Sequence, residues 1–194
     1  MICLSFILVL FIWIFLGWLL GWCLNLKILP KSWLICIPSI LSLLLIEDPT
    51  LIIKTGVFMG VLLFVAYYDY QTKTIPRFVH FVLLITGLIG INLSWLINQA
   101  IPGMLFLPFP VMAVYFYQKQ KDPIKNIGIG DIKLIAACGF VVGINKGVLG
   151  LFVGLALALL WCLIKRMNQS TSFPFAPFLC CGFIVSYLLN VLSI

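Results

Sequence analysis

The sequence predicts an all-α protein, a polytopic bundle of about eight transmembrane helices, some of them short or broken. Three observations lead to this fold class. The chain of 194 residues is 64% hydrophobic and only 9% charged, whereas a soluble domain carries about 25% charged residues. Long apolar runs alternate with short polar loops. Basic residues gather in every second loop, as they do on the cytoplasmic side of membrane proteins.

The first two expected spans form an N-terminal helical pair over 1–48. A helix needs about 20 residues to cross the hydrocarbon core. The first span, 2–24, has no basic segment before it and no small-residue cleavage site, so we expect a retained helix and no removed signal peptide. The second span, 32–46, is short, and we expect it to be tilted or incomplete.

Residues 49–194 are predicted to form a core of about six further transmembrane helices. The expected spans, in order, are 51–68, 78–97, 101–117, 131–143, 147–164 and 175–192. Pro102, Pro108 and Pro110 should bend or break the third of these, because proline cannot donate a helical hydrogen bond. The span 131–143 is short for a full crossing, so it is expected to begin inside a water-filled cavity.

The basic residues predict the orientation. With the N-terminus outside, two cations, Lys54 and Lys146, remain outside and ten face the cytoplasm. We interpret the net charge of +7 as topology signals and contacts with membrane lipids, and expect no nucleic-acid partner. The cytoplasmic cations are Lys27, Lys31, Lys73, Arg77, Lys119, Lys121, Lys125, Lys133, Lys165 and Arg166.

The seven cysteines point to neither a metal nor a disulfide framework. None belongs to a CxxC pair, and most lie within apolar runs, where cysteine behaves as a small hydrophobe. No metal site is therefore predicted.

The five acidic residues fall into two groups. Glu47, Asp48 and Asp122 lie in turns or loops, where a solvated charge explains them. Asp69 ends the first span of the core and Asp131 opens the fourth, so both are expected at the cytoplasmic face and at a similar depth. Carboxylates at the rim of apolar helices are costly and tend to mark function. An Asp at a helix start can equally be an N-cap, and that alternative stays open for Asp131.

Gly128 and Gly130 favour a catalytic interpretation of Asp131. Backbone without side chains would let an extended peptide approach the carboxylate. If Asp69 lay nearby, the two like charges would resist ionising together, and the pair would share one proton. One Asp would act as general base on a water, and the other would polarise the scissile carbonyl. Such a pair titrates as a unit, so neither Asp is assigned the proton.

Three segments carry recognisable motifs in a consistent order. They are the Asp at 69 followed by TIP at 74–76, GIGDIK at 128–133, and PFAPFL at 174–179. Together they resemble the first catalytic Asp with its Ile-Pro, the GxGDxK box and the PFGPFL segment of the type IV prepilin peptidases, which are GxGD aspartic proteases. GWCLN at 21–25 is a fainter match to the same family.

The resemblance implies an aspartic endopeptidase in the bacterial cytoplasmic (inner) membrane, with Asp69 and Asp131 as its catalytic pair. Its expected substrates are prepilins or the pseudopilins of secretion and competence systems, cut after a basic leader at the cytoplasmic face. The peptidase needs no cofactor. S-adenosylmethionine would be needed only if N-methylation of the new N-terminus is retained. The segment 27–32 runs almost directly into the second span and lacks the family's cysteine-tetrad insert, which argues against that second activity.

Five further residues have weaker claims. Lys133 could tune the Asp pair or contact substrate, although a snorkelling lysine explains it equally well. Pro76 is expected to fix the loop after Asp69. Pro174 and Pro177 could frame a non-helical segment that borders the site, although a plain helix start is an equal alternative. His80 is interpreted as an interface residue and not as a catalytic base.

Two other classes of function remain as alternatives. The first is an ion-coupled or proton-relay transporter that uses Asp69 and Asp131, because membrane carboxylates serve relays. This alternative leaves Gly128 and Gly130 without explanation. The second is a non-catalytic assembly subunit of a pilus or secretion machine.

Overall fold

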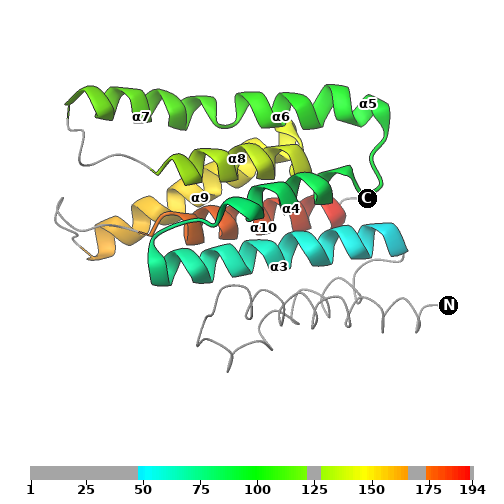
Figure 1. The fold of residues 1–194 in the computed structure, drawn as a ribbon, viewed down its shortest axis with the longest axis horizontal. Helices are drawn as coiled ribbons and strands as arrows, with labels where there is room; N and C mark the ends of the chain where they lie inside the picture. The colour runs from blue at the N-terminus through cyan, green and yellow to red at the C-terminus, as the bar shows by residue number, and fades with distance from the viewer. Residues whose placement is uncertain (1–47, 122–127, 166–173, 193–194) are drawn as a thin grey trace.

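The computed structural model describes residues 48–121, 128–165 and 174–192, and every regular element in these ranges is helical (Figure 1). The expected helical pair at 1–48 lies outside the described residues except for Asp48. The elements are α3 (Pro49–Thr72), α4 (Arg77–Leu88), α5 (Leu93–Trp95), the π-helical η2 (Leu96–Ala100), α6 (Ile101–Phe106), α7 (Phe109–Lys121), α8 (Ile129–Val142), α9 (Ile144–Lys165) and α10 (Ala176–Leu192).

Helix α3 is longer than the expected span 51–68. Proline follows the N-cap Asp48, where its fixed φ suits a helix start and its missing N–H costs nothing. The helix ends at Lys73, which adopts a left-handed φ of 55° and donates its backbone N–H to the Asp69 carbonyl at 2.8 Å. Asp69 therefore lies inside the last turn of the helix instead of following it.

The expected span 78–97 is wrong at its C-terminal end. Helix α4 stops at Leu88, and Gly90 then turns the chain with a φ of +63°. Glycine adopts this conformation without the steric cost of a side chain. The apolar residues beyond the turn belong to the next continuous helical segment, Leu93–Gln120.

The prolines interrupt this helical segment as the sequence predicts. Pro102 lies in the first turn of α6, directly after the π-helical η2, and such single π turns commonly absorb a local defect in a helix. A second break at 107–108 separates α6 from α7. Helical hydrogen bonding continues on both sides, from the Leu107 N–H to Gly103 at 3.3 Å and from the Met112 N–H to Pro108 at 2.8 Å.

Three of the described helical segments are long and apolar enough to cross a membrane: Thr50–Thr72, Leu93–Gln120 and Ile144–Ile164. The prediction of an all-α fold is thus confirmed for the described residues, which include three candidate membrane spans, while the count of about eight spans stays a prediction. Helix α8 has 14 residues. At 1.5 Å per residue it is about 21 Å long, shorter than the ~30 Å hydrocarbon core. Helix α8, which carries Asp131 in its first turn, is not one of the three segments named above.

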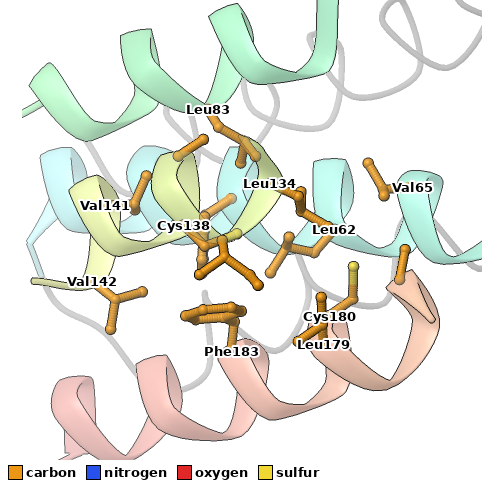
Figure 2. Packing of buried hydrophobic residues seen from close by; sticks show 14 of the residues in the cluster. Leu62, Val65, Leu83, Leu134, Cys138, Val141, Val142, Leu179, Cys180 and Phe183 are labelled. Carbon is orange, nitrogen blue, oxygen red and sulfur yellow. The ribbon is translucent and has the colours of Figure 1, made fainter. Parts of the chain in front are cut away.

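Helix α8 is central to the core. It packs against α4 and α6, and α10 packs against α9 and α3. Figure 2 shows the buried side chains that fill the space between these helices. They come from four helices: Leu62 and Val65 from α3, Leu83 from α4, Leu134, Cys138, Val141 and Val142 from α8, and Leu179, Cys180 and Phe183 from α10.

Glycines bring two helix pairs into backbone contact. A Cβ added at Gly182 of α10 would collide with the Gly150 carbonyl and would lie 2.8 Å from the Gly154 Cα, both in α9. Gly103 of α6 and Gly139 of α8 meet in the same way. Helices in lipid associate through such close van der Waals packing, because apolar burial adds little there.

We expect Gly182→Val to destabilise the protein by about 1–3 kcal/mol or more. The three atoms nearest to the new Cβ would all be α9 backbone atoms, so the two helices would have to separate. The measurement is thermal unfolding of the purified protein in detergent. The neighbouring Cys181→Val is the matched control, because Cys181 is exposed on the same helix. Equal melting temperatures for both variants would contradict the close α9–α10 contact.

Candidate active site

Four helix ends converge at one end of the bundle. In Figure 1 the C-terminal end of α3 and the N-terminal ends of α4, α8 and α10 all lie on the left. Each helix end leaves backbone groups without partners inside its own helix, so polar groups gather at such a place. Six of the eight residues proposed from the sequence lie in the first turns of these helices, at their caps or in the last turn of α3; the exceptions are Pro174, just before α10, and Lys133.

Asp69 is nearly fully buried, with 5% of its surface exposed. Its Oδ2 accepts a hydrogen bond of 3.2 Å from the backbone N–H of Ala176, the first residue of α10. This N–H is one of the donors that a helix start leaves unsatisfied. The partial positive charge of the helix N-terminus also favours a carboxylate at this point.

The proline-rich segment before α10 shapes this donor. Pro174 and Phe175 are not helical, whereas Pro177 lies inside the first turn. The expectation that both prolines frame a non-helical segment is therefore correct for Pro174 and wrong for Pro177. The Phe175 carbonyl accepts from the N–H groups of residues 178 and 179, and Pro177 has no N–H. The Ala176 N–H is left to bond Asp69.

Asp131 is half-buried in the first turn of α8. The N-cap of this helix is Gly128, with extended backbone (φ −65°, ψ 132°), so the alternative that Asp131 is the N-cap is wrong. Asp131 is three residues further on, and its carboxylate makes a hydrogen bond with the Gly128 backbone. This matches the half of a capping box in which an acidic residue at the third helical position reaches back to the N-cap.

The two carboxylates influence each other. Burial, and next the charge of Asp69, raise the pKa of Asp131 from 3.8 to about 7, while the Gly128 hydrogen bond lowers it. Asp69 and Asp131 are 62 positions apart in the sequence, yet they share one electrostatic environment. When the higher pKa of a carboxylate pair lies near 7, the pair can carry one proton and one negative charge at the same time.

The chain segment after Asp69 contacts the residue before Asp131. Pro76 is the N-cap of α4. A Cβ added at Gly130 would lie 3.4 Å from the Ile75 Cβ, which is ordinary packing distance. His80 Nε2 lies 3.3 Å from the Gly130 carbonyl oxygen. Neither this contact nor the Ala176 donor could be predicted from the sequence, because each joins a backbone group to a side chain far away in the chain.

Lys133 and the glycines have different surroundings. Lys133 is exposed. It lies about 200° around the helix from Asp131, because successive residues turn by ~100°. Gly128 is exposed beside the carboxylate, and a Cβ there would lie 3.0 Å from Asp131 Oδ2. Among the described residues, no group of three His, Cys, Asp or Glu side chains could hold a metal ion.

Apolar helices long enough to span a bilayer and two interacting carboxylates at one bundle end define a membrane protein with a candidate acid–base site. The model of the type IV leader peptidase family matches residues 56–163, which is more than half of the chain. The protein therefore belongs to the type IV leader peptidase family and is a prepilin leader peptidase of a membrane. The match includes Asp69 and Asp131 and ends before Pro174. Comparisons with curated proteins and with solved structures gave no match.

We expect Asp131→Asn to remove a pH dependence of stability. Because the pKa of Asp131 is about 7 when folded and near its usual 3.8 when unfolded, the folded state binds the extra proton between these values. The stability that this proton contributes is fully present below about pH 4 and is lost as the pH rises through 7. The melting temperature of Asp131→Asn minus that of the wild type should thus become more positive from pH 4.5 to pH 8.

Scanning fluorimetry in detergent at four pH values measures this difference. Asp48→Asn is the matched control, because Asp48 is exposed at the opposite end of α3, away from the Asp pair. A difference for Asp131→Asn that stays flat across the same range would show that the carboxylate keeps an ordinary pKa.

Proposed function

We propose that the protein is an aspartic endopeptidase that removes the leader from type IV prepilins or pseudopilins, with Asp69 and Asp131 as its water-activating pair. The observation that carries this proposal is the electrostatic contact between two carboxylates from separate helices, of which one has its pKa raised to about 7. Membership of the leader peptidase family supports the substrate class.

In the proposed reaction the pair holds one proton and binds a water between its carboxylates. The ionised Asp removes a proton from the water as it attacks the scissile carbonyl carbon, and the protonated Asp donates a hydrogen bond to the carbonyl oxygen. The tetrahedral intermediate then collapses, the C–N bond breaks and the leaving amine takes a proton from the pair. The mechanism needs no cofactor, and the shared proton returns to the pair after each cycle.

The surroundings of the two carboxylates suit different parts of this cycle. Asp69 is nearly fully buried, and its Oδ2 accepts a hydrogen bond from the Ala176 N–H, which fixes the orientation of this carboxylate. Asp131 is half-buried beside exposed Gly128, where an extended peptide could approach without meeting a side chain. We leave the proton unassigned, because strongly coupled sites titrate as a pair.

The topology proposed with this function has about eight spans, an external N-terminus and the Asp pair at the cytoplasmic side of the bacterial inner membrane. The positive-inside bias of ten cations against two supports it. The short α8 supports it too, because a 14-residue helix that begins at the site leaves room for water at its N-terminal end. Proposed partners are the substrate prepilins and the surrounding lipids.

We expect Asp69→Asn and Asp131→Asn each to lower leader cleavage by at least a hundredfold, because either change removes the ionisable pair. The variants are co-expressed with a prepilin, and gel mobility reports leader removal. Asp48→Asn, with an exposed carboxylate at the far end of α3, should cleave like the wild type. Unchanged leader removal in both site variants would sink the peptidase mechanism.

We further propose that this chain cleaves without methylating the product. The short segment 27–32 lacks the family's cysteine-tetrad insert. Mass spectrometry of the mature pilin should therefore find a free N-terminal amine even when S-adenosylmethionine is supplied. A mass increase of one methyl group would overturn this part of the proposal and leave the peptidase assignment intact.

A further inference from the structure

His80 connects the helix that follows Asp69 to the residue that precedes Asp131. It lies in the first turn of α4. Its Nε2 is 3.3 Å from the Gly130 carbonyl oxygen and its Nδ1 is 3.1 Å from the Arg77 carbonyl oxygen. Helices α4 and α8 pack against each other along the bundle, and in Figure 1 they lie side by side near the converging helix ends.

The two contacts differ in character. A carbonyl oxygen only accepts hydrogen bonds, so a bond to Gly130 requires the proton on Nε2. The Gly130 contact joins residues 50 positions apart and is partly buried, whereas the Arg77 contact spans three residues of one helix turn and is exposed. Water can replace the exposed partner but not the partly buried one. The bond from Nε2 to Gly130 is therefore the contact that links the two helices.

This bond acts on the residue next to Asp131. Ile75 lies beside the same glycine, since a Cβ added at Gly130 would be 3.4 Å from the Ile75 Cβ. The polar contact from His80 is therefore the one that fixes the Gly130 carbonyl. The distance and orientation between the two carboxylates depend on how the first turn of α8 sits against α3 and α4. Displacing reacting groups by about 1 Å can cost a hundredfold in rate.

We propose that His80 is a positioning residue. Its Nε2–H bond to the Gly130 carbonyl holds the Asp131 carboxylate at the distance and orientation relative to Asp69 that the reaction requires. The inference rests on the proposed peptidase function and adds to it a role for a residue outside the motifs. His80 itself touches neither water nor substrate in the reaction. Its loss should therefore lower kcat and leave KM nearly unchanged.

The test compares two substitutions that each keep one half of the imidazole. The side-chain amide of Gln reaches the place of Nε2, and the shorter amide of Asn reaches the place of Nδ1. We expect His80→Gln to keep kcat within about threefold of wild type and His80→Asn to lose about 10–100-fold, both with KM within about twofold. The assay follows leader cleavage of a purified prepilin by the full-length enzyme in detergent, and melting temperatures verify that both variants fold.

The outcomes separate this inference from the proposed function. Equal kcat values for the Gln and Asn variants, or a loss confined to KM, would overturn the positioning role. If Asp131→Asn is inactive in the same assay, the peptidase assignment stands regardless. If the wild-type enzyme itself fails to cleave any prepilin offered, the proposed function and the role of His80 both fall.

Discussion

A helix end leaves backbone N–H groups without partners in its own helix, and where such groups are buried they must bond to other parts of the chain. This constraint organises the site. The first N–H of α10 bonds the Asp69 carboxylate, and the first turn of α8 is closed by a bond between Asp131 and Gly128. The two carboxylates that serve as helix-end partners are also the pair proposed for catalysis. In this region the same hydrogen bonds serve the fold and the chemistry.

The glycine contacts give these helix ends a defined relative position. At Gly103–Gly139 and at Gly182 with Gly150 and Gly154, helix backbones touch directly. Two helices in backbone contact cannot shift relative to each other through a change of side-chain rotamer, because no flexible side chain lies between them. The helices that carry Ala176 and Asp131 are thereby each held against a neighbouring helix at one close backbone contact.

Much of the fold and of the site could be predicted from the sequence, for reasons that differ between residues. The helices could be located from the apolar runs, because a helix that crosses a bilayer must be apolar. Asp131 could be located from the GIGD segment, because few acidic residues occur in such a chain. The end of α4 could not be predicted, because apolar residues continue past Gly90 and only its positive φ reveals the turn. The contacts of Ala176 and His80 could not be predicted from the sequence either. Each depends on a backbone atom, which carries no sequence signal, at separations of 107 and 50 residues.

The bond between Asp69 and Ala176 has a consequence for how the protein is made. Asp69 belongs to the first described helix and Ala176 to the last, so the ribosome synthesises more than a hundred residues between the two partners. Until α10 enters the bilayer and packs against α3, the Asp69 carboxylate lacks its backbone donor. A nascent chain that stalls before α10 is inserted would thus carry both aspartates without the hydrogen bond to Ala176. The proposed site is complete only after α10 has packed against α3.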